Sequence, residues 1–340
     1  MVIQGCSKFA KVLPMSVKLL FPLILFFWQN SAFALTQPDF DKIQDDQNQA
    51  FSSLYLAPNE DSYWQFAPSL SERTDVLLSV GTFRTLVAAS YGKFDHVIMA
   101  DLDQRIVDFN KRQIAALKVS KTVESFLAHL LGYRESQAAI HEAMQGHPEQ
   151  LQNFIATHVQ DGPETQYILK VASLAAKDPS NSFLKDPAAY DRLHQLAVEG
   201  RIYAVAASLA NTTTYYKIAE LLKRENLKVG AIDVSNVPDY ICLRKNLSEF
   251  LYNLMTLPFT SDAVINQTAY NTPEKYKGVS TTWGYISVPL KAFLSLAIKK
   301  RQIGNDMGFY LFFRKQWLAE ISETPIDILH RNQCSRIFAN

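Results

Sequence analysis

The stretch that decides the fold is Val76-Leu77-Leu78-Ser79-Val80-Gly81, followed by a helical pattern at residues 83–91 and then by His96-Val97-Ile98-Met99-Ala100-Asp101. The two runs are short and mostly apolar, as expected of strands that are buried on both faces of a parallel sheet. A glycine and a helix between such strands are typical of the opening of a Rossmann-like βαβ unit. We therefore predict that the two strands lie side by side and aim Gly81 and Asp101 into one cleft.

The same alternation of strands and helices returns later in the chain, which indicates an α/β domain with a Rossmann-like, mostly parallel sheet flanked by helices. Between the two α/β parts, residues 121–200 show helical patterns separated by Gly and Pro, and we interpret them as a helical insertion or cap. We expect further strands at 201–208, 228–234 and 279–288, helices from 104, at 214–227 and at 290–303, and a polar loop at 260–277.

The composition fits one large globular domain and argues against nucleic acid as a partner. Of the 340 residues, 48% are hydrophobic and 20% are charged, so the chain is able to bury a sizeable core. The formal net charge is only +1, whereas binding to phosphates requires a concentrated basic face. We expect a small molecule or a protein as the substrate.

The first 34 residues have the pattern of a secretory signal peptide. Three lysines precede an apolar run at 19–28, and an A-x-A cleavage site, Ala32-Phe33-Ala34, follows it. A run of ten residues is too short to span a bilayer, so a permanent membrane anchor is the weaker interpretation. We predict that residues 35–340 are exported to the periplasm or beyond. In such oxidising surroundings Cys242 and Cys334 form either one disulfide or two buried thiols.

Polar residues follow several of the predicted strands. In an open parallel sheet, ligands bind beyond the carboxyl ends of the strands, so we expect Gly81, Asp101, Ser208 and the pair Ser235-Asn236 to face one crevice. Asp101 follows Gly81 by 20 residues, where such folds place the carboxylate that accepts hydrogen bonds from a ribose.

Other chemistries lack their motifs. His141 and His147 are six residues apart, which does not place two imidazoles on one helix face as zinc proteases require, and we predict no metal site. The chain contains neither a G-x-S-x-G turn nor a P-loop. A secreted hydrolase that uses the same strand ends remains a third and weaker hypothesis.

The order of elements and the acid after the second strand resemble those of class I S-adenosylmethionine-dependent methyltransferases. In that family the first turn is rich in glycine, whereas the segment Ser79-Val80-Gly81-Thr82-Phe83-Arg84-Thr85 keeps only the first glycine. Phe83 stands at the second glycine position, where the backbone ordinarily approaches the methionine part of the cofactor. The resemblance implies the methyltransferase-like fold with a degenerate first turn.

A closer resemblance is to a little-characterised bacterial group of methyltransferase-like proteins, which has no settled substrate. It covers most of the mature chain and is carried by short motifs. These are Asn59-Glu60-x-Ser62-Tyr63, Val80-Gly81, Asp101, the stretch 125–131, Val234-Ser235-Asn236-Val237-x-x-Tyr240 and the stretch 250–258.

The resemblance implies roles for residues on both sides of the first turn. Asp101 would hold the ribose hydroxyls, with Asp103 as the second choice, and Gly81 would admit the methionine end of the cofactor. Arg84 would pair with the cofactor carboxylate, while Asn59, Glu60 and Ser62 would close over the ligand. The structural alternatives are that Asp101 and Asp103 cap the next helix, that Arg84 forms a surface salt bridge, and that Asn59 caps a turn.

Methyl transfer depends on orientation more than on acid–base groups, so the chain needs no catalytic triad for it. The polar residues best placed near an acceptor are Ser208, Asn211, Ser235 and Asn236, and their alternative role is to cap the turns after the strands.

Two hypotheses follow. The first is an exported protein that uses S-adenosylmethionine to methylate an unknown acceptor. The second is a non-catalytic relative that has lost the cofactor and binds another ligand or partner. Export favours the second hypothesis, since the periplasm and the exterior hold little of that cofactor.

Overall fold

A computed structural model describes residues 35–43, 54, 56–57, 60–178, 182–210, 212–237, 247–270 and 283–301. Contacts divide the chain into two units, residues 1–35 and residues 36–340, and the described helices and strands lie in the second. The predicted signal peptide and both cysteines of the mature chain lie outside the described residues. Within those residues, no helix is long and apolar enough to cross a membrane.

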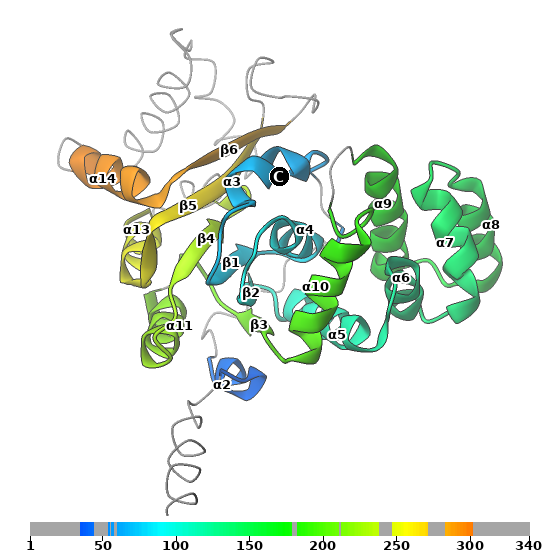
Figure 1. Ribbon diagram of the computed structural model, residues 1–340, viewed down its shortest axis with the longest axis horizontal. Helices are drawn as coiled ribbons and strands as arrows, with labels where there is room; N and C mark the ends of the chain where they lie inside the picture. Colours follow the sequence, from blue (N-terminus) through cyan, green and yellow to red (C-terminus); the bar gives the residue numbers. More distant parts are fainter. Residues whose placement is uncertain are drawn as a thin grey trace, which may run out of the picture. The chain divides into compact units, whose positions relative to one another are not determined.

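The centre of the domain is a six-stranded sheet with the order β3-β2-β1-β4-β5-β6 (Figure 1). Neighbouring strands from β3 to β5 are parallel, and β6 is antiparallel to β5. The strands are β1 (Val76–Val80), β2 (His96–Asp101), β3 (Ile202–Ala206), β4 (Val229–Asp233), β5 (Phe259–Tyr270) and β6 (Trp283–Pro289).

The opening unit matches its prediction. Strand β1 pairs with β2 in parallel, with Val76 beside His96 and Val80 beside Ala100. Helix α4 (Phe83–Tyr91) connects them, and almost all of its side chains are buried. The central strands are buried along nearly their whole length because helices cover both faces of the sheet.

Helices flank the sheet on two sides, as the sequence predicts. Figure 1 shows α4 and α10 on one side of the strands and α11 and α13 on the other. Five of the described helices that follow β2 are α5 (Gln104–Val119), α10 (Pro187–Val198), α11 (Thr212–Arg224), α13 (Leu247–Thr256) and α14 (Leu290–Arg301). In the described part of the chain before β1 there are three short helices: α2 (Gln37–Asp41), the 3-10 helix η1 (Tyr63–Phe66) and α3 (Ala67–Leu70).

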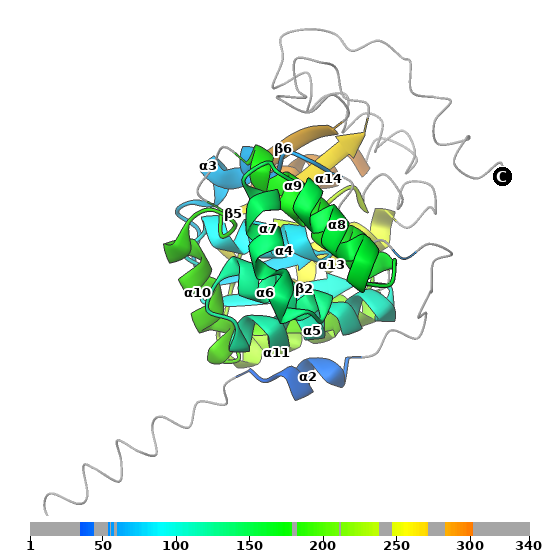
Figure 2. The ribbon, with the colours of Figure 1, turned by 90° about the vertical axis from the view of Figure 1, so that its right-hand side faces the viewer.

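The stretch from 121 to 200 is helical in all its regular elements among the described residues, in line with the predicted insertion. Its helices are α6 (Val123–Leu131), η2 (Arg134–Ser136), α7 (Gln137–Met144), α8 (Glu149–His158), α9 (Pro163–Lys177) and the α10 given above. They share one hydrophobic core with β1, β2 and α5. Figure 2 shows α6 to α9 gathered together on one side of the domain. The insertion therefore packs into the α/β domain and does not fold around a core of its own.

The prediction of a polar loop from residue 260 is wrong, because residues 259–270 form strand β5. Ala263, Val264 and Ile265 are buried where β5 lies between β4 and β6. Asn266, Gln267 and Thr268 are polar yet also buried, and such residues break the apolar pattern by which strands are found in a sequence.

Candidate functional site

The order of the strands reverses between β1 and β4, and this is where open α/β sheets bind their ligands. Strand β1 ends at Val80 and is followed by Gly81, and β4 ends at Asp233 and is followed by Val234 and Ser235. Strand β2, on the far side of β1, ends with Asp101. The parallel register of β1 with both neighbours brings these three strand ends to the same edge of the sheet.

Gly81 forms the turn from β1 into α4. Its φ angle of +103° lies in the region that favours glycine, which explains this residue type at the end of the strand. The Gly81 amide donates to the carbonyl of Ala100 at 3.1 Å, and the Gly81 carbonyl accepts from the side-chain amide of Asn110 at 3.0 Å. The amide of Gly81 is therefore fixed to β2, and its carbonyl is fixed to α5.

Asp101 lies beside this turn with a carboxylate that no side chain engages in the described part of the chain. Its Oδ1 accepts from the backbone amide of Asp103 at 2.9 Å. Burial raises the pKa of Asp101 to about 7, and the nearby charge of Asp103 adds to the shift, although backbone hydrogen bonds oppose it. The predicted placement of Gly81 and Asp101 on adjacent strand ends is confirmed.

Asp103 has the capping role that was the alternative to a ribose contact. It is the N-cap of α5, and its Oδ1 accepts from the backbone amide of Arg105 at 2.9 Å. The guanidinium of Arg105 also donates to the same carboxylate, with Nη2 2.6 Å from Oδ2. The two acids of the stretch 101–103 thus differ. The carboxylate of Asp103 is occupied by its own helix, whereas that of Asp101 accepts only from backbone amides among the described residues.

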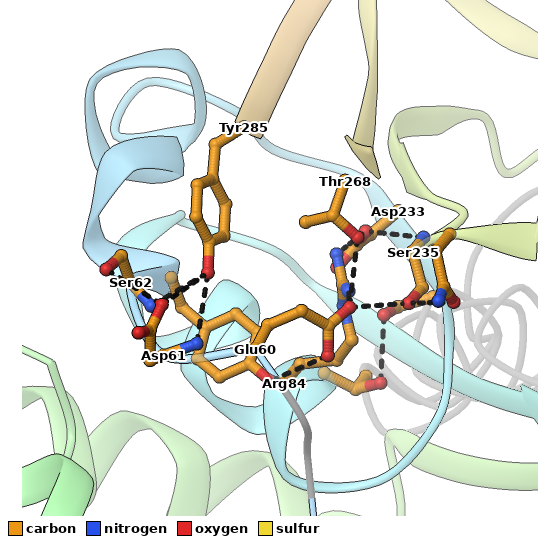
Figure 3. A network of polar contacts seen from close by, with 12 residues as sticks. Glu60, Asp61, Ser62, Arg84, Asp233, Ser235, Thr268 and Tyr285 are labelled. Carbon is orange, nitrogen blue, oxygen red and sulfur yellow. Dashed lines mark hydrogen bonds and ion pairs between the residues drawn. The ribbon is translucent and has the colours of Figure 1, made fainter. Parts of the chain in front are cut away.

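Arg84 lies in the interior, so the interpretation as a surface salt bridge is wrong. Its Nε and Nη2 donate to the two carboxylate oxygens of Asp233, at 2.8 and 2.5 Å, and its Nη1 donates to Glu60 at 2.5 Å (Figure 3). The side chains of Arg84, Asp233 and Glu60 are only 4%, 1% and 3% exposed. The ion pairs thus join the start of α4 to the end of β4 and to the segment before η1.

The charges of Arg84, Asp233 and Glu60 do not balance, because one guanidinium faces two carboxylates. Burial disfavours the charge of Arg84, but Asp233 and Glu60 outweigh it and raise the pKa of the guanidinium. For Asp233 burial dominates over the attraction of Arg84, and the pKa of this carboxyl is raised. Among the described residues, this group of ion pairs therefore holds one carboxylate more than the guanidinium of Arg84 neutralises.

Glu60 gathers hydroxyl donors from three elements. Its Oε1 accepts from Ser235 at 2.8 Å and from Thr268 of β5 at 2.9 Å, and its Oε2 accepts from Tyr63 at 3.1 Å. We name the group Glu60, Arg84, Asp233, Ser235 and Thr268 the switch-point cluster.

The residues after Glu60 are also tied to the sheet. The hydroxyl of Tyr285 in β6 accepts from the backbone amides of Asp61 and Ser62, at 3.1 and 2.8 Å (Figure 3). The segment 60–62 is therefore fixed to β6 by its backbone and to α4, β4 and β5 by the carboxylate of Glu60. Glu60 and Ser62, which we expected to close over a ligand, form hydrogen bonds within the domain, Glu60 through its carboxylate and Ser62 through its backbone amide. Asn59 lies outside the described residues.

Phe83 does not point its ring toward the Gly81 turn. The ring is 1% exposed and packs against the rings of Tyr63, Tyr167 and Phe183, with centroids 5.8 to 6.2 Å apart. A phenylalanine at this position thus serves the core, and its ring leaves the ligand side of the turn to the backbone.

The four residues suggested for an acceptor separate into three groups. Ser208 has a local role, since its Oγ accepts from the amide of Ala210 at 3.1 Å and its own amide donates to Thr214. Ser235 belongs to the switch-point cluster and has a φ of 53°, which is rare for serine. Its hydroxyl, which donates to Glu60 at 2.8 Å, also lies 3.2 Å from Oδ1 of Asn236. Asn211 lies outside the described residues. Of the four, Ser235 and Asn236 are therefore the pair that the structure places beside the strand reversal.

The sequence interpretation missed two partners of the cluster. Asp233 ends an apolar strand in the same way as Asp101, so the same signal was available for it. Thr268 gave no signal, since it lay in the segment interpreted as a loop.

A comparison with protein-family models gives a match over most of the chain. A family model described as "Domain of unknown function (DUF7790)" matches residues 55–314, which include the switch-point cluster and Asp101. No curated protein matches the chain.

Proposed function

The chain belongs to the DUF7790 family, and we propose that it is a methyltransferase-like protein that binds the nucleoside half of S-adenosylmethionine at the ends of β1 and β2. The observation that carries the proposal is the available carboxylate of Asp101 beside the fixed Gly81 turn. The methyl acceptor in this hypothesis is a small molecule or a protein.

The sheet order supports a Rossmann-like fold for this domain. Numbered along the chain, the strands follow the order 3-2-1-4-5-6, which is that of the doubly wound dinucleotide-binding fold. The antiparallel β6 is the departure from an all-parallel sheet. The ligand of such a fold lies outside the strand ends near β1, where Gly81 and Asp101 are found.

The nucleoside half of the cofactor fits the residues present. Within the part of the chain that the structure describes, the carboxylate of Asp101 accepts only from backbone amides, which leaves lone pairs for the two ribose hydroxyls. Asp103 fits the same role less well, because Arg105 and its amide already occupy both carboxylate oxygens.

The amino-acid half fits less well. All three nitrogens of the Arg84 guanidinium donate to Asp233 or Glu60, so this side chain would have to break a buried ion pair to reach a cofactor carboxylate. Breaking a buried pair costs several kcal/mol. We therefore withdraw Arg84 as a cofactor ligand and assign it to the architecture of the site.

Bound S-adenosylmethionine would supply an activated methyl group, and the protein would have to orient the acceptor in line with it. Ser235 and Asn236 are the polar residues of the described chain that follow β4 at the strand reversal. Their hydroxyl and amide would orient an acceptor by hydrogen bonds.

Calorimetric titration of the purified chain 35–340 with S-adenosylmethionine and S-adenosylhomocysteine tests the proposal. We expect Asp101→Ala to weaken binding at least about tenfold, since hydrogen bonds to a charged group contribute about 1.5–3 kcal/mol. The matched control is Asp108→Ala, which removes an acid from the exposed face of the same region. No heat from the unmodified chain at about 1 mM ligand would refute the proposal.

The second candidate is a non-catalytic binding protein of the same fold. It is favoured by the occupied guanidinium of Arg84, which leaves the carboxylate end of the cofactor without the cation that the resemblance implies. Binding of adenosine with the same affinity as S-adenosylmethionine, without turnover of methyl groups, would select this alternative.

We also propose that the protein is exported, on the basis of the leader pattern in residues 1–34. Expression of the full chain with a C-terminal tag, followed by fractionation and mass measurement, tests this. Cleavage after Ala34 is expected, and an uncleaved chain confined to the cytoplasm contradicts it.

A further inference from the structure

Three uncharged polar side chains are fully buried between the helical insertion and the Gly81 turn. Asn110 and Gln113 lie on α5, Tyr167 lies on α9, and all three are 0% exposed. They form a chain of hydrogen bonds: Tyr167 to Gln113 at 2.5 Å, Gln113 to Asn110 at 2.9 Å, and Asn110 to the Gly81 carbonyl at 3.0 Å. We name this chain the turn relay.

The direction of every bond in the turn relay is set by its end at Gly81. A backbone carbonyl only accepts, so Asn110 must present its amide N–H to Gly81 and its oxygen to Gln113. Gln113 must then donate to Asn110 and present its own oxygen to Tyr167, whose hydroxyl must donate. The hydroxyl of Tyr167 in the insertion is thus the outer end of an oriented chain of hydrogen bonds that begins at the Gly81 carbonyl.

Tyr167 also reaches the other side of the turn through its ring. The ring packs edge-on against Phe83, the first residue of α4, with centroids 6.2 Å apart, and against Phe109 at 4.9 Å. Gly81 and Phe83, the neighbours of Thr82 in the turn, are therefore both linked to α9. Gly81 is linked by the hydrogen bonds of the turn relay, and Phe83 is linked by its ring contact with Tyr167. Burial of a polar side chain destabilises the fold unless the side chain forms hydrogen bonds. Apolar side chains would pack α5 against α9 without this requirement, which suggests that the three polar residues have another role.

We propose that Tyr167 is a positioning residue: the helical insertion fixes the conformation of the Gly81 turn through the turn relay and so prepares the nucleoside site. The role in ligand binding rests on the proposed function, whereas the role in fixing the turn does not. A site that is held in its bound conformation before the ligand arrives loses less entropy on binding. The insertion is then part of the binding machinery, although none of its residues need touch the ligand.

The test compares Tyr167→Phe with Tyr190→Phe. Both changes remove one hydroxyl from a buried tyrosine in the insertion, and the hydroxyl of Tyr190 donates to the carbonyl of Ser120 at 3.0 Å, away from the turn. Two properties are measured for each purified variant: hydrogen exchange of the backbone amides at 78–86, and the affinity for S-adenosylhomocysteine by calorimetry.

We expect Tyr167→Phe to raise exchange at 78–86 and to weaken binding about tenfold, while Tyr190→Phe changes neither. The double variant Tyr167→Phe/Asn110→Asp is expected to bind no more weakly than Asn110→Asp alone, because the relay is already broken at Gly81. Equal exchange at 78–86 in the two tyrosine variants overturns the inference, and so does raised exchange with unchanged affinity. If the unmodified chain does not bind the ligand, the proposed function fails, and the exchange comparison alone decides whether the relay fixes the turn.

Discussion

Replacement of Arg84 by methionine tests the charge arrangement of the switch-point cluster. Methionine fills a similar volume but carries no charge, so the carboxylates of Asp233 and Glu60 remain buried without a cation. Removal of one partner from a buried ion pair costs about 3–5 kcal/mol. For a domain of this size the midpoint of thermal unfolding should fall on the order of 10 °C.

The matched variant is Glu60→Gln, which removes the excess negative charge and keeps the shape. The glutamine oxygen still accepts from Arg84, Ser235 and Thr268, and its amide faces the hydroxyl of Tyr63, which is able to accept. We expect a cost below about 1.5 kcal/mol, since a charged hydrogen bond becomes a neutral one while one buried charge disappears.

Denaturant titration of the two variants and of the unmodified chain gives the comparison, with the transition midpoint and its slope recorded separately. The expected result is a much lower midpoint for Arg84→Met than for Glu60→Gln. Equal losses in the two variants would refute the idea that the cluster holds one acid too many. A loss below about 1 kcal/mol for Arg84→Met would show that its two carboxylates are solvated in solution.

Three further predictions concern the strand ends. Because the folded state raises the pKa of Asp101 to about 7 from 3.8, it holds this proton more tightly than the unfolded chain does, and stability should fall as the pH rises between these values. Asp101→Asn should therefore gain stability relative to the unmodified chain from pH 4 to pH 7, and a constant difference in midpoint would contradict this. Gly81→Ala should cost about 1–2 kcal/mol through backbone strain alone, because the added Cβ would meet Arg84 only at 3.7 Å; calorimetric unfolding measures it, and no loss would mean that the turn adopts another conformation. Asp103→Ala should cost about 1 kcal/mol through the lost cap of α5 and leave the nucleoside affinity unchanged, so weaker binding in a titration would reassign the ribose contact to this residue.

The sequence was sufficient for the local units of the fold. Strand β1, helix α4 and strand β2 are each marked by their own residues, and the rule for parallel strands then places Gly81 beside Asp101. The insertion was recognisable for the same reason, because Gly and Pro separate its helical patterns.

The partners of Arg84 were out of reach of such reasoning. Asp233 lies 149 residues after Arg84 in the sequence. The two residues meet because the chain, after β2 and β3 on one side of β1, adds β4 on the other side of β1. Thr268 lies in strand β5, where Asn266, Gln267 and Thr268 are buried although they are polar, so this strand does not follow the apolar pattern. The turn relay was missed because Asn110 and Gln113 interrupt the apolar face of an otherwise ordinary helix.

In the turn between β1 and α4, the backbone of Gly81 and the side chain of Arg84 have different roles. The backbone of Gly81 is fixed by β2 and by the turn relay, and it faces the ribose-binding candidate Asp101. The side chain of Arg84, three residues on, points into the core and holds Glu60 in place. Glu60 is therefore unable to close over a ligand, as the resemblance implies, without the loss of a buried ion pair and three hydroxyl bonds. It follows that the segment 60–62 is held in place by buried contacts, so that any ligand of the proposed site meets this segment in a position that is set in advance.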